Sequence, residues 1–100
     1  MGASKISMSK SIIQKNKETC FLCGGRASEE HHVIYGTANR KLSEKYGLKV
    51  YLCANCHRIG KYAVHNCKET DTKLKIIAQR RFIEEYPHQD FVRIFGKNYI

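Results

Sequence analysis

The chain has 100 residues, and its 18 Lys and Arg outnumber nine Asp and Glu to give a formal net charge of +9. A chain of this length forms one domain that buries only about 60 to 68% of the surface exposed on unfolding, so a structural metal would stabilise it usefully. Because no apolar run is long enough to cross a membrane or to act as a secretory signal, we expect a cytoplasmic protein, where its five cysteines favour metal over disulfides.

Residues 1–17 predict a flexible basic arm, because four lysines stand among serines without any acid. Ile12 and Ile13 offer the alternative that a short part of this segment docks on the domain. Residues 18–100 are then expected to form a single domain. It opens with the sequence TCFLCGG, in which two glycines permit the tight backbone of a metal-binding turn.

Two strands and an intervening helix are expected next. The first strand is predicted over residues 30–35, and a short helix fits between Thr37 as N-cap and Gly47 as the C-terminal stop. The alternating sequence LKVYLC, residues 48–53, predicts a second strand that enters the second cysteine pair. This order of elements indicates the α+β class.

The C-terminal third predicts two helices. In ETDTKLKIIAQRRFIEEY, Thr70 or Asp71 is the expected N-cap, apolar residues follow at helical spacing, and Pro87 ends the segment. The sequence DFVRIFG predicts a short terminal helix. We expect the aromatic side chains of this region to pack the helices onto the domain, with a base-stacking platform as the alternative; these are Phe82, Tyr86, Phe91, Phe95 and Tyr99.

Four cysteines form two C-x2-C pairs separated by 29 residues: Cys20, Cys23, Cys53 and Cys56. This spacing is typical of a structural zinc site, since each pair lets two thiolates of one turn reach the same ion. The alternatives are a pair of redox motifs or disulfides. Cys67 is expected to be a lone buried thiol, or else to replace one of the four ligands.

Four histidines lie within 35 residues around these cysteines: His31, His32, His57 and His65. If the thiolates satisfy the zinc, the imidazoles are available to bind a second metal or to act as a base near neutral pH. The alternatives are that His57 or His65 replaces a cysteine ligand, or that individual histidines are surface or packing residues.

Three segments between Cys20 and Asn66, CFLCG, EEHHVIYG and LKVYLCANCHRIGKYAVHN, resemble the HNH endonucleases, a family of ββα-metal (His-Me finger) nucleases. They look most like short phage-encoded members with a built-in four-cysteine zinc site. The resemblance covers about half of the chain. It implies a small zinc-stabilised ββα-metal domain with C-terminal helices, which acts on double-stranded or branched DNA in a bacterial host cell as a metal-dependent endonuclease or nickase.

The resemblance also implies roles for the histidines. His31 and His57 would bind the catalytic divalent metal (Mg²⁺, Mn²⁺, Ni²⁺, Co²⁺ or Zn²⁺), His65 would approach the same ion, and His32 would be the general base. Adjacent side chains of a strand point to opposite faces, so both roles require a bend or a phosphate lying between the rings, and an exchange of the two roles is the alternative. The family's middle Asn has no counterpart in register, since Leu48 stands near its place, and substitution by Asn39 or Asn55 in the loop is the alternative.

Basic residues accumulate between residues 36 and 62, where Glu44 is the single acid. Candidate contacts to DNA phosphates are Arg40, Lys41, Arg58 and Lys61. The same charge can simply solvate a surface. It also serves the alternative function, a non-catalytic zinc-stabilised nucleic-acid-binding module, and a protein-interaction zinc domain is a weaker third possibility.

Overall fold

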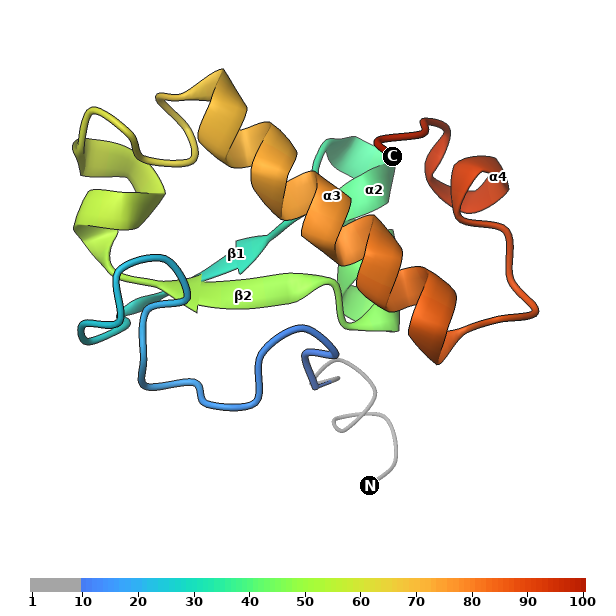
Figure 1. The fold of residues 1–100 in the computed structure, drawn as a ribbon, viewed down its shortest axis with the longest axis horizontal. Coiled ribbons are helices and arrows are strands. Elements are labelled where there is room, and N and C mark those ends of the chain that lie inside the picture. Colours follow the sequence, from blue (N-terminus) through green and yellow to red (C-terminus); the bar gives the residue numbers. More distant parts are fainter. Residues whose placement is uncertain (1–9) are drawn as a thin grey trace.

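The structure, a computed structural model, describes residues 10–100 of the chain, so the first nine residues of the predicted arm lie outside the described part. It confirms the α+β class and has a ββα-like arrangement. The elements in chain order (Figure 1) are β1 (Glu29–His32), α2 (Thr37–Tyr46), β2 (Lys49–Leu52), the short π-helical segment η1 (Asn55–Ile59), α3 (Lys68–Glu85) and α4 (Phe91–Phe95). The ββα-like unit comprises β1, β2 and η1.

The sheet consists of β1 and β2, paired antiparallel with His31 opposite Val50 and His32 opposite Lys49. β1 begins one residue earlier than predicted and ends at His32, three residues earlier than predicted. The chain remains attached beyond that point through the N–H of Val33, which donates to the carbonyl of Leu48. Because side chains alternate across a strand, His31 and His32 belong to opposite faces of this sheet.

Helix α2 begins at Thr37 itself, so the predicted N-cap is one residue out: Gly36 holds that position without a side-chain cap. Gly47 ends the helix as predicted, in the left-handed conformation with φ 75°. A side chain at Gly47 would also collide with the carbonyl oxygen of Lys10. This glycine therefore allows the N-terminal segment to approach the helix end.

The described part of the predicted arm, residues 10–17, contacts the domain. The N–H of Ile12 donates to the carbonyl of Gly47 at 2.9 Å, and the guanidinium of Arg81 donates to the carbonyl of Ile12. Ile12 and Ile13 both pack against the hydrophobic core. Residues 10–17 therefore agree with the alternative that a short part of the N-terminal segment docks on the domain.

Helix α3 lies across the sheet (Figure 1) and supplies Leu74, Ala78 and Phe82 to the core. It starts at Lys68 after Cys67 as N-cap, which corrects the predicted start at Thr70 or Asp71. Four rings surround that of Phe82 at centroid distances of 5.1 to 5.9 Å: Tyr46, Tyr86, Phe91 and Phe95. The C-terminal aromatic side chains therefore pack the domain, and they do not form an open stacking platform.

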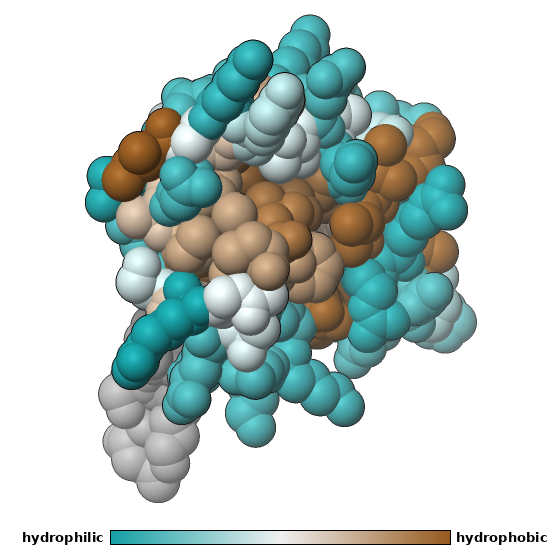
Figure 2. Space-filling view, turned by 60° about the vertical axis from the view of Figure 1, so that its left-hand side comes forward, coloured by the Kyte–Doolittle hydropathy of each residue, from teal (hydrophilic) through white to brown (hydrophobic). Residues whose placement is uncertain are grey.

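The short terminal helix α4 is confirmed, and the side chain of Asp90 caps it by accepting from the N–H of Arg93. Figure 2 shows apolar residues gathered in the middle of one face of the molecule, with hydrophilic residues above and below them. Among residues 10–100, no helix is both long and apolar enough to cross a membrane.

Candidate metal centres

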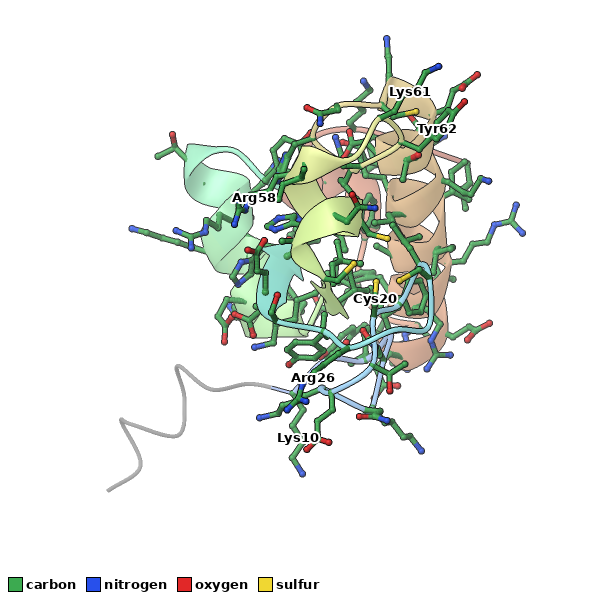
Figure 3. All side chains as sticks on the ribbon, turned by 90° about the vertical axis from the view of Figure 1, so that its left-hand side faces the viewer. Lys10, Cys20, Arg26, Arg58, Lys61 and Tyr62 are labelled. Atoms are coloured by element: carbon green, nitrogen blue, oxygen red, sulfur yellow. The ribbon has the colours of Figure 1, made fainter. Side chains whose placement is uncertain are left out.

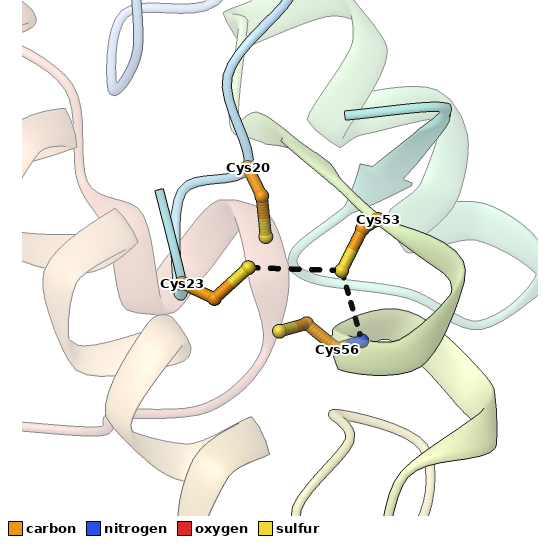
Figure 4. A group of neighbouring side chains, drawn as sticks. All are labelled: Cys20, Cys23, Cys53 and Cys56. Atoms are coloured by element: carbon orange, nitrogen blue, oxygen red, sulfur yellow. Dashed lines mark hydrogen bonds between the residues drawn. The ribbon is translucent and has the colours of Figure 1, made fainter. Parts of the chain in front are cut away.

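The structure brings together two cysteines of the turn before β1 and two at the junction of β2 and η1 (Figure 4): Cys20, Cys23, Cys53 and Cys56. Their sulfurs all lie within 4.8 Å of one another, and those of Cys23 and Cys53 are 3.8 Å apart. Tetrahedral coordination with metal–sulfur bonds of about 2.3 Å places two sulfurs about 3.8 Å apart. The four cysteines are free thiols, and their spacing fits a single bound metal ion.

The backbone of the first loop shapes this cluster. The N–H of Cys20 donates to the carbonyl of Gly25, and that of Gly24 donates back to the carbonyl of Cys20, with Gly24 at φ 81°. Cys67 lies outside the cluster at the start of α3 and is half-exposed, not buried as predicted.

The thiols of this cluster differ in their pKa values. Burial raises the pKa of Cys20, but backbone N–H donors led by that of Cys23 outweigh it and lower the pKa to about 6. Burial and the neighbouring thiols raise the pKa of Cys56 above its ordinary value. Four thiolates cannot crowd together without a cation, so a metal ion bound here would let all four ionise.

A second group consists of His31 from β1, His57 from η1 and His65 from the following loop. One nitrogen of each ring lies within 4.8 Å of the others, and the Nε2 atoms of His57 and His65 are 3.1 Å apart. Two nitrogens at that separation can both lie about 2.0 to 2.1 Å from one ion. We call His31, His57 and His65 the histidine trio.

His31 is the buried member of the trio, with 3% of its surface exposed. Its Nε2 atom is buried without a hydrogen-bond partner among the described residues. Burial, reinforced by the charge of His57, lowers the pKa of His31 to about 3, and the pKa of His65 is lowered in the same way. His31 and His65 are therefore neutral near pH 7, with nitrogen lone pairs available to a metal ion.

Glu29 lies on the same face of β1 as His31 and orients the ring of His57. Its carboxylate is 2.7 Å from Nδ1 of His57 and also accepts from the guanidinium of Arg58 at 2.8 Å. The hydrogen bonds from Arg58 and then from His57 lower the pKa of Glu29 to about 2. An ionised carboxylate on Nδ1 favours the tautomer that leaves Nε2 of His57 free to bind metal.

The loop after η1 folds back to place His65 beside His57. The N–H of His65 donates to the carbonyl of His57 at 3.2 Å, and the Asn66 amide donates to the carbonyls of Arg58 and Gly60. A Cβ at Gly60 would lie 2.8 Å from the carbonyl oxygen of Asn55, so glycine is required for this close turn. The two hydrogen bonds of Asn66 thus fasten this loop.

His32 does not join the trio. Its Nε2 lies 2.8 Å from a carboxylate oxygen of Glu44, and the ammonium of the buried Lys49 bonds both carboxylate oxygens of Glu44 at 3.1 Å. Although burial raises the pKa of Glu44, these hydrogen bonds from His32 and Lys49 lower it overall. The strand does not bend enough to bring both adjacent histidines to one site.

The predicted phosphate contacts lie on the surface around these groups. Arg40 and Lys41 are exposed on α2, and Lys61 is exposed beside Tyr62 in the loop after η1. Arg58 and Lys61 both project from the η1 region (Figure 3). Arg58 differs from the other three because it already forms an ion pair with Glu29, while 57% of its side chain remains exposed.

Sequence reasoning missed Glu29, Glu44 and Asn66. Glu29 was detectable, because it stands two residues before His31 and therefore shares its face of the strand. The other two act through contacts that depend on tertiary structure. No family model, no curated protein and no solved structure matches this chain.

Proposed function

We propose that the protein is a metal-dependent DNA endonuclease or nickase of the HNH type. The histidine trio carries this proposal, because three imidazoles with an outer carboxylate converge at a place separate from the four cysteines. The resemblance of the Cys20–Asn66 segment to HNH nucleases and the net charge of +9 support a DNA substrate.

The cysteine group is proposed as a structural zinc site. Tetrathiolate sites of this kind are saturated, so they supply folding energy and leave no position for a substrate. The trio offers only three protein ligands, so a metal ion bound there retains open positions. The closed site would then stabilise the fold, and the open site would bind the substrate phosphate.

The reaction is the attack of water on phosphorus with cleavage of the bond to the 3′ oxygen, giving a 5′ phosphate and a 3′ hydroxyl. A divalent ion, when bound, would supply Lewis-acid stabilisation of the phosphate and of the departing oxygen. His31 and His57 hold its position, and Glu29 fixes the ring of His57. Exposed Arg40, Lys41 and Lys61 neutralise neighbouring phosphates.

His32 is retained as the proposed general base. Its ring is oriented by a hydrogen bond to Glu44, and a carboxylate that orients an imidazole is the usual partner of a catalytic histidine. Because His32 lies on the other face of β1 from His31, the role requires the scissile phosphate to reach over the strand end, where β1 stops at His32.

Incubation with supercoiled plasmid in Mg²⁺, Mn²⁺ or Ni²⁺ tests the proposal. Wild type should give nicked circles, His57→Ala should give none, and His88→Ala, a matched change of an exposed histidine outside both groups, should behave as wild type. Undiminished nicking by His32→Ala would remove that residue from the mechanism and leave the trio. Salt-sensitive DNA binding without cleavage by wild type in any metal would instead establish the alternative, a non-catalytic nucleic-acid-binding module.

A further inference from the structure

Three residues that sequence analysis did not connect form one side of the histidine trio. The ring of Tyr35 lies 6.0 Å from that of His31 and 5.7 Å from that of His65, measured between centroids. The Tyr35 hydroxyl donates to Oδ2 of Asp71 at 3.1 Å, and Lys75 forms an ion pair with the same oxygen at 2.8 Å. Tyr35 therefore connects the trio to a charged pair on α3.

Lys75 is held in place by these neighbours. Its ammonium lies 4.4 Å from the centre of the Tyr35 ring, and its side chain is only 16% exposed. Within residues 10–100 it forms one ion pair, with Asp71, although an ammonium has three N–H donors. Since this ammonium also bonds the Tyr35 hydroxyl, one donor of a partly buried and positioned cation remains available beside the trio.

Asp71 is a largely buried residue at the start of α3. It is 9% exposed, and its second oxygen, Oδ1, is buried and accepts no hydrogen bond from any described residue. Burying a carboxylate oxygen without a hydrogen-bond partner costs free energy, beyond what an acidic side chain in the first turn of a helix requires. The contacts that Asp71 does make, to Lys75 and Tyr35, fix the positions of those two side chains.

The charge of the surroundings points to an anion. An imidazole that binds a metal carries no charge, so a divalent ion held by the trio would keep its full charge, unlike an ion bound by carboxylates. The ammonium of Lys75, held through Asp71 and Tyr35, adds a second positive charge beside the trio. An anionic ligand would relieve this accumulation of positive charge.

We propose that Lys75, positioned by Asp71 and Tyr35, forms a phosphate subsite beside the histidine trio that binds a non-bridging oxygen of a DNA phosphodiester. The inference rests on the proposed nuclease function, because it places the substrate against the trio. Lys75 is a substrate-binding residue, whereas Asp71 and Tyr35 are positioning residues that act through it.

The test compares Lys75→Gln with Lys73→Gln, which removes an equal charge from an exposed residue of the same helix. Binding of a fluorescent 20-base-pair duplex is measured by anisotropy at several salt concentrations without added divalent metal, and plasmid nicking is measured in parallel with Mn²⁺. Lys75→Gln should weaken binding and reduce the slope of log Kd against log salt by about 0.9, the value for one lost phosphate contact. It should also raise KM, and Lys75→Arg should restore both properties.

The outcomes separate the subsite from the enzyme activity. If Lys75→Gln keeps the binding, salt slope and KM of wild type, or changes them no more than Lys73→Gln does, the proposed subsite is wrong while the nuclease assignment stands. Specific loss of binding in Lys75→Gln with no nicking by wild type would support the subsite and reject the nuclease. If Lys75→Gln fails to fold, the double variant Asp71→Asn, Lys75→Gln leaves no unpaired buried charge and is measured in its place.

Discussion

Replacement of His31 by Leu should stabilise the protein when the trio holds no metal and destabilise it relative to wild type when metal is present. His31 is 3% exposed, and its buried Nε2 has no partner among the described residues. A buried polar atom without a hydrogen bond costs about 1 to 3 kcal/mol. His31→Leu removes that cost and fills a similar volume with apolar atoms.

The structure gives the expected size of the reversal. Without metal in the trio, the free energy of unfolding should rise by about 1 to 3 kcal/mol, and each 1 kcal/mol corresponds to about 4 to 8 °C in Tm for a domain of this size. With Mn²⁺ or Ni²⁺ at 1,000 times its Kd, wild type gains about 4.1 kcal/mol, which exceeds this rise over its whole range. His31→Leu keeps only two imidazoles of the trio and should gain little.

Thermal unfolding followed by circular dichroism, with zinc retained at the cysteines and with divalent metal added in steps, measures both effects. His88→Leu provides the control, because it makes the same chemical change at an exposed residue and should keep the metal-dependent gain. A variant that melts below wild type without added metal, or that gains as much as wild type from metal, would refute the assignment of His31 as a buried ligand.

Three further predictions concern pH, the cysteines and the core. Burial, followed by the charges nearby, lowers the pKa of His31 from 6.5 in the unfolded chain to about 3 in the folded protein. Between pH 6.5 and pH 3 the unfolded chain is therefore protonated at His31 while the folded protein is not, so without metal in the trio the free energy of unfolding should fall as pH drops, by at most about 1.4 kcal/mol per pH unit for this group. Urea unfolding of His31→Leu at the same pH values should not show this contribution. Cys53→Ser should lose the structural metal, whose binding is worth on the order of 10 kcal/mol in such sites, and should show no cooperative melt, whereas Cys67→Ser should keep one tightly bound metal by elemental analysis. Phe82→Ala should lower the free energy of unfolding in urea by about 3 to 5 kcal/mol, and a similar loss for the exposed Val92→Ala would contradict the packing described above.

The elements that the sequence predicted correctly are those fixed by local chemistry. Gly47 stops α2 because its left-handed backbone suits glycine, and Pro87 lies just after the end of α3. The paired C-x2-C spacing predicted the cysteine cluster for the same reason, since each pair depends on one tight turn. Local rules failed at the start of α3, where Cys67 precedes the helix without a side-chain cap.

The candidate site was predicted less completely because its contacts join distant segments. The trio combines residues from β1, η1 and a loop, and the resemblance to a family indicated their order but no distances. The separation of His31 from His32 followed from strand alternation and was foreseen as a difficulty. Nothing in the local sequence around Tyr35 predicted its bond to Asp71, 36 residues away.

The two candidate metal centres are linked through the chain itself. Cys56 and His57 are consecutive residues of η1, so binding of an ion by the cysteines also fixes the strand-to-helix junction from which His57 projects. The backbone repeats this link: the N–H of Val64 donates to the carbonyl of Cys56, and that of His65 donates to the carbonyl of His57. The backbone therefore ties His57 and His65 to the cysteine loop. We therefore expect the cysteines to bind metal before the histidines do. Metal binding by the histidine trio would then report that the whole ββα-like unit is folded.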